Sequence, residues 1–218
     1  HRAKITPKIV GTMDDLRASM QEDMEVLFDA EGGFKKIPTE FPYKTVVLVD
    51  VSGLQDLILK EILKLETIPV QKAWGLATQQ QYGQCAMQTK EYLRTLLNLP
   101  CNVVIISQQR VFGGRDDGMD PDLVKPVVGA GVMPSIAAWL NPAVDYVVQT
   151  YKRPRMVERT STIAGKVIKT VERGRGVEYC LRTEPHDVYM TKFRVPRGHA
   201  LPECIVDPTF DKILDIIR

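Results

Sequence analysis

An aspartate at the end of an apolar run is the first residue whose position points to chemistry. Asp50 follows TVVLV at residues 45–49, a run rich in β-branched residues and without polar alternation. Such a run is typical of a strand in a parallel sheet, buried on both faces, and ligands bind beyond the carboxyl ends of these strands. One carboxylate there suits Mg²⁺, which prefers oxygen ligands and keeps several waters. The alternative is that Asp50 only caps the next helix.

A second apolar run ends in polar residues in the same way. NVVIIS at residues 102–107 leads into Gln108, and neighbouring parallel strands bring their carboxyl ends to one edge of a sheet. We therefore expect Ser52, Ser107 and Gln108 to share a nucleotide-binding site with Asp50. The Gln108 amide can sense a γ-phosphate or orient an attacking water. Alternatively, it satisfies loose backbone groups where the strand ends.

Helical spacing around these runs assigns the fold class. Apolar residues recur at intervals of three and four, as on one face of a helix. The segments with this spacing are residues 16–28, 54–65 and 78–99, with shorter helices expected at 134–140 and 207–217. Apolar strands that alternate with helices define the α/β class, with a mainly parallel central sheet.

The last third of the chain has a different pattern, in which apolar and polar residues alternate as in antiparallel strands. The alternating segments are residues 167–171, 177–182 and 188–195, after a third apolar run at 143–151. We therefore expect a single domain. Residues 1–43 would form an N-terminal strand and helix region, residues 44–151 the nucleotide-type core, and residues 152–218 a β-rich antiparallel extension with a closing helix.

Composition and charge narrow the functions further. No apolar run reaches the roughly 20 residues of a membrane-spanning helix, and no CxxC pair suggests zinc, so we expect a cytoplasmic protein without a membrane partner. The net charge is +2, but residues 151–200 hold 12 Lys and Arg against 5 Asp and Glu. This local excess favours a phosphate-bearing partner. A solvated surface with scattered Lys and Arg is the alternative.

A long polar segment precedes the basic region. Residues 113–132, GGRDDGMDPDLVKPVVGAGV, are rich in Gly, Asp and Pro. Segments this long without apolar periodicity are usually functional loops. We expect a functional loop here, after the strand that ends at Ser107.

Together these segments resemble a family. The order VVLVDVSGLQDL, VVIISQQR, a glycine-rich loop and the late YCLRTEPH and TKFR segments is similar to phage-encoded RecA-like P-loop ATPases related to recombination and single-strand annealing proteins. The resemblance covers residues 44–218. It implies a RecA-like three-layer core that binds ATP and Mg²⁺, acts on single-stranded DNA, hydrolyses ATP and assembles into a homo-oligomeric ring or filament. A phage origin would place the protein in the host cytoplasm.

The resemblance also implies roles for individual residues. Asp50 matches the Walker B aspartate that holds Mg²⁺, and Gln108 matches the glutamine that follows the sensor strand. The loop at residues 113–132 matches the position of a DNA-contacting loop. The expected DNA-binding residues are the basic positions in and around this loop and in the segment after it: Arg110, Arg115, Lys125, Lys152, Arg153 and Arg155.

Glu31 is a second catalytic candidate beside Gln108. LFDAEGG at residues 27–33 looks like the strand that carries the water-activating glutamate in this family. However, only 18 residues lie between Glu31 and Asp50, too few for the helix and strand that should intervene. The residues before Glu31 also fit a helix.

The phosphate loop of this family does not occur in the sequence. No GxxxxGK[ST] motif is found, and the Gly-Lys pair at residues 165–166 lacks the upstream glycine and the following Ser or Thr. That loop would supply the backbone N–H cradle and the lysine for the β and γ phosphates. We expect it upstream of His1, because the sequence does not begin with Met. Alternatively, the chain is a non-catalytic nucleic-acid-binding or assembly module, or an unrelated α/β nucleotide enzyme.

Overall fold

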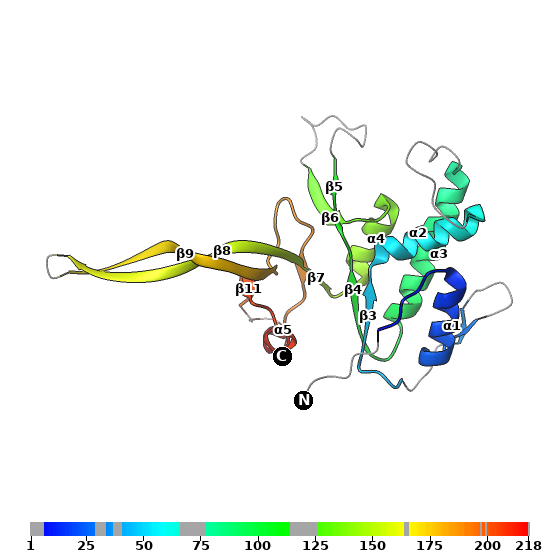
Figure 1. Cartoon of the computed structure of the whole chain (residues 1–218), viewed down its shortest axis with the longest axis horizontal. Coiled ribbons are helices and arrows are strands. Elements are labelled where there is room, and N and C mark those ends of the chain that lie inside the picture. Colours follow the sequence, from blue (N-terminus) through cyan, green and yellow to red (C-terminus); the bar gives the residue numbers. More distant parts are fainter. Residues whose placement is uncertain are drawn as a thin grey trace. The chain divides into compact units, whose positions relative to one another are not determined.

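The chain has a mixed α/β fold in two compact units. In the first part helices alternate with strands, and in the last part strands dominate (Figure 1). The computed structural model describes residues 7–28, 34–36, 41–65, 77–113, 126–163, 166–196, 198 and 200–217. Unit 1 comprises residues 1–110 and 130–140, and unit 2 comprises residues 111–129 and 141–218. The single domain expected from the sequence stays a prediction.

Two parallel strands form the sheet of unit 1. β3 (Thr45–Val49) pairs in register with β4 (Asn102–Ile106). Parallel strands need a long crossover connection, and α2 (Val51–Leu63) and α3 (Gln79–Leu97) lie within it. The predicted order of apolar strand, helices and apolar strand is therefore confirmed. In the described residues, however, the parallel sheet has only these two strands.

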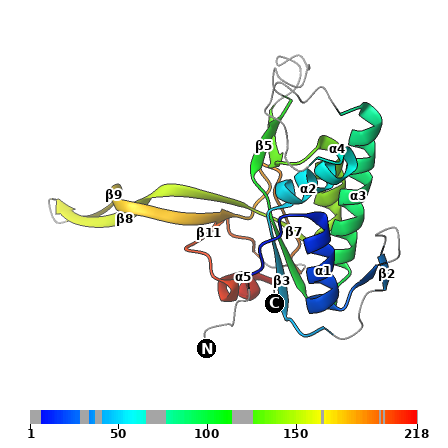
Figure 2. The ribbon, with the colours of Figure 1, turned by 45° about the vertical axis from the view of Figure 1, so that its right-hand side comes forward.

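Burial alternates along both strands. Val47 and Val49 are 51% and 74% exposed, and Val104 and Ile106 on the neighbouring strand are 39% and 45% exposed. These positions share one face of the pair, while α2 and α3 both lie on the other side of it in Figures 1 and 2. The expectation that the strands are buried on both faces is therefore wrong for the described residues of unit 1, because helices cover one face only.

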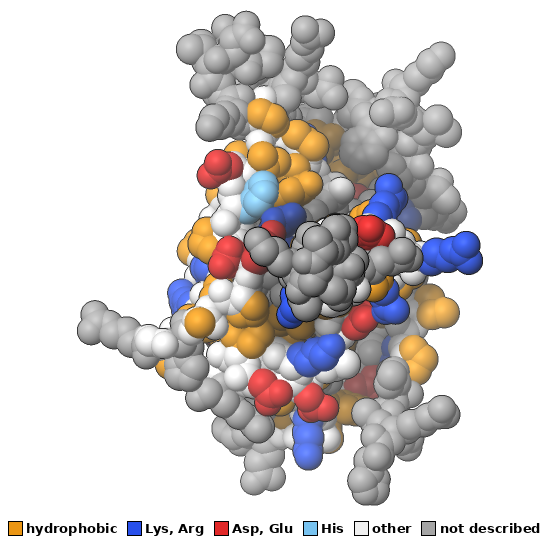
Figure 3. All heavy atoms as spheres, turned by 90° about the vertical axis from the view of Figure 1, so that its left-hand side faces the viewer, with side chains coloured by type: hydrophobic (Ala, Val, Ile, Leu, Met, Phe, Trp, Pro, Cys, Tyr) orange, Lys and Arg blue, Asp and Glu red, His pale blue; other side chains and the backbone are white. Residues whose placement is uncertain are grey.

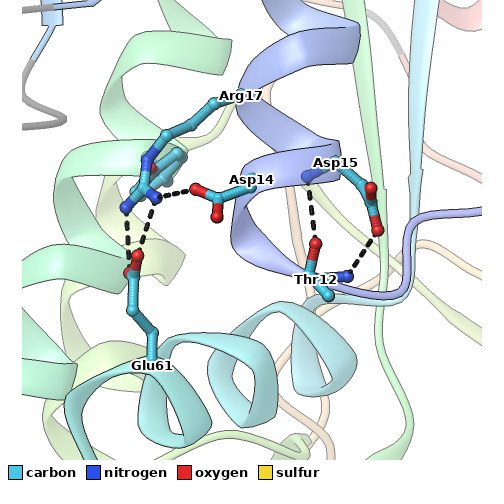
Figure 4. A network of polar contacts seen from close by, with 6 residues as sticks. Thr12, Asp14, Asp15, Arg17 and Glu61 are labelled. Atoms are coloured by element: carbon cyan, nitrogen blue, oxygen red, sulfur yellow. Dashed lines mark hydrogen bonds and ion pairs between the residues drawn. The ribbon is translucent and has the colours of Figure 1, made fainter. Parts of the chain in front are cut away.

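Helix α1 (Met13–Met24) begins at a capping box, a reciprocal pair of side-chain to backbone hydrogen bonds. The Thr12 hydroxyl accepts the Asp15 N–H at 3.1 Å, and the Asp15 carboxylate accepts the Thr12 N–H at 2.9 Å (Figure 4). The helix ends earlier than the spacing predicts, because Glu25 takes a left-handed conformation with φ 52°. The predicted end at Gly32 and Gly33 lies outside the described residues.

Arg17 joins α1 to the next two helices (Figure 4). Its guanidinium donates to both carboxylate oxygens of Glu61 on α2, at 2.6 and 2.9 Å, and to Asp14 at 3.1 Å. Its Nε donates to the Tyr92 hydroxyl on α3 at 2.9 Å. The hydrogen bond to Glu61 raises the pKa of Arg17. One side chain thus links three helices.

The core of unit 1 lies between its helices, whose buried side chains recur at intervals of three and four. The buried apolar residues are Val51, Leu54, Ile58 and Leu59 on α2, and Cys85, Ala86, Tyr92, Leu93 and Leu96 on α3. Met13 and Met20 come from α1, and Ile136, Ala137 and Leu140 from α4 (Pro134–Ala143). The predicted helical segments therefore do carry the core.

Unit 2 is built around a long antiparallel ribbon, formed by β8 (Gln149–Ile163) and β9 (Lys166–Arg182) (Figure 1). Fifteen residues of β8 extend over about 50 Å at the usual rise per residue, and β11 (Cys204–Val206) adds a third strand only beside residues 180–182. The predicted antiparallel character of this region is confirmed. The remaining described elements are β1 (Leu27–Phe28), β2 (Phe34–Lys36), β5 (Gln109–Phe112), β6 (Val127–Ala130), β7 (Tyr146–Val147), β10 (Lys192–Phe193) and α5 (Phe210–Ile217).

A bulge explains why the sequence predicts two strands where β9 is one. The register shifts between Pro154 and Met156, and β9 there inserts extra residues around Arg175. The flanking glycines are required, since a Cβ on Gly174 would lie 2.5 Å from a methyl of Val157, and Gly176 has φ +107°. The inserted residues break the polar and apolar alternation without ending the strand.

Two other predicted strands differ from the structure. The run at residues 143–151 is divided between the end of α4, the short β7 and the start of β8. In the segment at residues 188–195, only Lys192–Phe193 form a strand, which pairs with β7. A ring contact joins the two short strands, with the ring centres of Tyr146 and Phe193 4.7 Å apart.

Candidate functional site

Asp50 lies at the junction of β3 and α2. Its Oδ1 accepts the Gly53 N–H at 2.7 Å and caps the helix, as the capping alternative proposes. A cap uses one carboxylate oxygen. Oδ2 remains directed toward the neighbouring strand, so capping and ligand binding are compatible in this side chain.

Gln108 lies beside Asp50, as the sequence predicts. Val49 is opposite Ile106 at the ends of the parallel pair, so the residues that follow emerge at one edge. The Gln108 Nε2 lies 3.5 Å from the Asp50 Oδ2, at the long limit of a hydrogen bond. The predicted juxtaposition is therefore present, while the chemical roles of the two side chains stay predictions.

Ser52 and Ser107 both bind the backbone of Gly131. The Ser52 hydroxyl donates to the Gly131 carbonyl at 2.7 Å, and the Ser107 hydroxyl accepts the Gly131 N–H at 3.0 Å. The same N–H donates to the Gln108 carbonyl at 2.6 Å. These hydroxyls therefore hold the end of the 113–132 segment against the ends of β3 and β4, and their predicted contact with nucleotide is untested.

A close backbone approach and a second side chain complete this attachment. A Cβ on Gly131 would lie 2.9 Å from the Gln108 carbonyl oxygen, so this position requires glycine. The Gln55 Oε1 on α2 accepts the Met133 N–H at 2.8 Å. Sequence reasoning missed Gly131, Gln55 and Met133. The only signal was the short GAG run at the end of the expected loop.

A groove of about 770 Å³ runs along β3 and is lined by Asp50, Asp56, Lys60 and residues of α1. Its volume is within the range of small-ligand sites. Burial raises the pKa of Asp56, and the nearby Asp50 carboxylate raises it further, while Lys60 lowers it. Asp56 is therefore a second carboxylate near the strand ends, one that the sequence pattern did not single out.

The donor set at this edge fits a hydrated Mg²⁺ better than a transition metal. Within the described ranges no group of three His, Cys, Asp or Glu side chains could enclose an ion. The group next to the Asp50 Oδ2 is the Gln108 amide nitrogen, at 3.5 Å, and the carboxylate oxygen itself is the ligand type that Mg²⁺ prefers. Asp50 would hold such an ion directly or through its water shell.

The other predicted site residues are scattered. Arg110 is exposed in β5, and Lys152, Arg153 and Arg155 lie in β8. Arg153 donates to Glu178 on β9 at 3.0 Å. Glu31, Arg115 and Lys125 lie outside the described residues. The DNA-binding and catalytic roles expected of all these residues stay predictions.

Comparison with known families assigns the chain to a family. The profile of the family described as AAA domain matches residues 3–195. The chain belongs to this family of P-loop ATPases, whose members generally bind ATP with Mg²⁺. No curated protein and no solved structure matches the chain.

None of the helices in the part of the chain described above is long and apolar enough to cross a membrane.

Proposed function

We propose that this chain is the RecA-like ATPase core of a phage protein for DNA recombination or single-strand annealing, which binds ATP with Mg²⁺ and acts on single-stranded DNA. Family membership supports a nucleotide-binding ATPase-like module. The resemblance of VVLVD, SQQR and the YCLRTEPH segment supports the finer assignment. The observation that carries the proposal is the approach of Gln108 to Asp50 at the carboxyl ends of two parallel strands.

The side chains at this edge have separable tasks. The helix cap fixes the Asp50 carboxylate, so its free oxygen keeps one direction. The Gln108 amide lies next to that oxygen and is placed to hold a water by hydrogen bonds. A Mg²⁺ ion held by Asp50 would neutralise phosphate charge. A RecA-like three-layer core would also cover the exposed face of β3 and β4 with a second layer of helices.

The attachment of Gly131 offers a route from the site to the segment at residues 113–132. Ser52, Ser107 and Gln108 all bind this glycine, so a change in any of them shifts the end of the segment. Ligand-dependent ordering of a loop is a common switch. In a ring or filament, an arginine of the neighbouring subunit would complete the site.

The proposal is tested by DNA-stimulated ATP hydrolysis with Asp50→Asn. Asparagine caps a helix as well as aspartate does, so the variant removes the charge and keeps the fold. We expect hydrolysis to be abolished, and Gln108→Leu to lower it by about 10²- to 10³-fold, the usual effect of losing one positioned hydrogen-bond donor. The exposed Asp187→Asn is the matched control. Wild-type turnover in Asp50→Asn would place the site elsewhere.

The absence of a GxxxxGK[ST] motif from the sequence favours a second candidate function. In this alternative the chain keeps the fold as a non-catalytic nucleic-acid-binding or assembly module. It would then bind single-stranded DNA with the same affinity with and without ATP. Wild-type protein without any turnover, together with such binding, would support the module over the enzyme.

A further inference from the structure

The two faces of the β8–β9 ribbon differ in how their charges are paired. Side chains alternate between the faces along a strand, and residues opposite one another share a face. Arg153, Arg155 and Glu178 share one face. The Arg153 Nε lies 3.0 Å from one oxygen of Glu178, and the Arg155 Nε lies 3.9 Å from the other. Positive charge on this face is partly neutralised within the ribbon itself.

The opposite face, which we call the open face, carries cations without such partners. It is formed by alternate residues of both strands: Lys152, Met156, Glu158, Lys169, Val171, Arg173, Val177 and Tyr179. In the described part of the chain, no carboxylate forms an ion pair with Lys152, Lys169 or Arg173. Glu158 is the one acidic side chain among the described residues of this face. The open face therefore has a net positive charge available to a ligand.

Apolar and aromatic side chains lie between these cations. Tyr179 is 58% exposed, and Met156, Val171 and Val177 are exposed to a similar degree. The Lys152 ammonium lies 5.2 Å from the centre of the Tyr179 ring. Figure 3, which faces the tip of the ribbon, shows basic side chains (blue) exposed beside hydrophobic ones (orange). A surface that alternates cations with exposed rings and methyl groups suits nucleotides, which offer a phosphate and a flat base.

The bulge adds a further cation near the middle of the ribbon. Arg175 lies between Gly174 and Gly176, and it is exposed. Bulges commonly re-aim a side chain out of the regular alternation. No acidic partner of Arg175 occurs within the residues that the structure describes. The glycines that shape the bulge thus also present an unpaired guanidinium.

We propose that the open face binds single-stranded DNA, with phosphates on Lys152, Lys169 and Arg173 and a base stacked on Tyr179. This inference rests on the proposed DNA substrate, and it assigns its binding to the ribbon instead of to the segment at residues 113–132. Lys169 is opposite Thr160, eight positions along β8 from Lys152, which is about 26 Å and leaves room for several nucleotides. A duplex is the weaker fit, since its bases are stacked and offer Tyr179 no free ring face.

The test is fluorescence anisotropy of a labelled oligothymidylate with the full chain, without nucleotide, over a range of salt. We expect affinity to fall with salt by a log-log slope of about 0.7 for each phosphate contacted. Arg173→Gln should reduce the slope by about 0.7, and Lys169→Gln with Arg173→Gln by about 1.4. The matched control is Arg194→Gln, which removes the same charge from an exposed arginine of unit 2 that pairs with Asp145. It should leave the slope unchanged.

Stacking is tested separately at Tyr179. Tyr179→Leu should weaken oligothymidylate binding by roughly five-fold or more, the usual effect of losing one aromatic platform, without changing the salt slope. Tyr179→Phe keeps the ring and should bind as wild type does. Circular dichroism and thermal unfolding verify that these variants of exposed residues remain folded.

Three results would overturn the inference. Wild-type protein that does not bind oligothymidylate, equal losses in Arg194→Gln and Arg173→Gln, or duplex DNA bound as tightly as single strands would each exclude the open face as a single-strand site. Asp50→Asn is measured in parallel and should bind DNA normally without ATP. If the proposed nucleotide site is wrong, only the hydrolysis measurements will differ from these expectations. If the proposed DNA site on the ribbon is wrong, only the DNA-binding measurements will differ.

Discussion

Ser52 and Ser107 show how polar residues at strand ends can serve the backbone. Both hydroxyls lie at the edge where a ligand is expected, yet both bind Gly131. Asp50 has a similar double role, with one oxygen capping α2 and the other beside Gln108. At the scale of single residues, the site is therefore held in place by hydrogen bonds that precede any ligand.

Gly131→Ala tests the close approach at this edge. A Cβ there would lie 2.9 Å from the Gln108 carbonyl oxygen. A backbone atom cannot move aside as the end of a flexible side chain can. We expect the free energy of unfolding to fall by about 1–3 kcal/mol, as for other overpacked positions. Urea denaturation measures this change in the free energy of unfolding.

Gly83→Ala is the matched control, because a Cβ there has nothing within 4 Å. Gly83 lies within α3, where alanine is favoured over glycine by about 0.5–1 kcal/mol. The two identical substitutions should therefore change stability in opposite directions. Equal effects would show that the contact at Gly131 does not constrain the fold.

Asp56→Asn tests the raised pKa of this carboxyl. Burial, then the Asp50 charge, disfavour the ionised form, so the folded protein holds this proton to higher pH than the unfolded chain does. Asp56 therefore lowers stability as pH rises above its ordinary value of 3.8. We expect Asp56→Asn to raise the melting temperature at pH 7, with a gain that shrinks as pH falls toward 4.

The exposed Asp187→Asn is the control for this pH series. It removes a carboxylate of the same type from a solvated position in unit 2. A gain for Asp56→Asn that is independent of pH, or a loss at pH 7, would contradict the assigned effect of burial.

Sequence reasoning located Asp50 and Gln108 because parallel strands bring their carboxyl ends together whatever the length of the connection between them. It could not locate Gly131, Gln55 and Met133. Their contacts with α2 span 78 or 79 positions in the chain, and no local pattern marks such partners. Asp56 was missed for the same reason, since its environment depends on how α2 packs.

At the scale of elements, the helices were predicted well and the ribbon poorly. The apolar faces of α2 and α3 are buried, so their spacing is visible in the sequence. The ribbon is solvated on both sides beyond its base, and many of its hydrophobic side chains are exposed. The apolar and polar alternation is therefore visible only at residues 167–171 and 177–182, because the bulge around Arg175 interrupts it.

Arg17→Lys tests the link between α1, α2 and α3. Lysine keeps the charge but cannot donate to both Glu61 oxygens and to the Tyr92 hydroxyl at once. The Arg17 side chain is only 21% exposed, so unmet partners are costly. We expect a loss of about 1–3 kcal/mol in the free energy of unfolding, as for hydrogen bonds to charged groups.

Arg94→Lys is the matched control for this link. Arg94 is 53% exposed and pairs with Glu91 within α3. Exposed pairs of this spacing contribute about 0.2–0.5 kcal/mol, so the control should change stability by no more than that. A loss at Arg94 as large as at Arg17 would argue against a special role for the three-helix contact.

At the scale of the whole molecule, family membership supports a nucleotide-binding ATPase-like module. The AAA domain match spans residues 3–195, which includes both parallel strands and the ribbon. The relation to P-loop ATPases was visible in the sequence because Asp50 and SQQR follow apolar strands. The number of strands was not, since the sheet of β3 and β4 has two strands in the described residues and exposes one face.

The central claim is that the edge formed by Asp50 and Gln108 binds a nucleotide through Mg²⁺. The most direct test is equilibrium binding of a fluorescent ATP analogue to wild-type protein and to Asp50→Asn, each with Mg²⁺ and with EDTA. We predict binding by wild type that requires Mg²⁺ and is lost in Asp50→Asn, while both proteins melt at the same temperature. Equal binding by the two proteins, or binding that is indifferent to Mg²⁺, would contradict this claim.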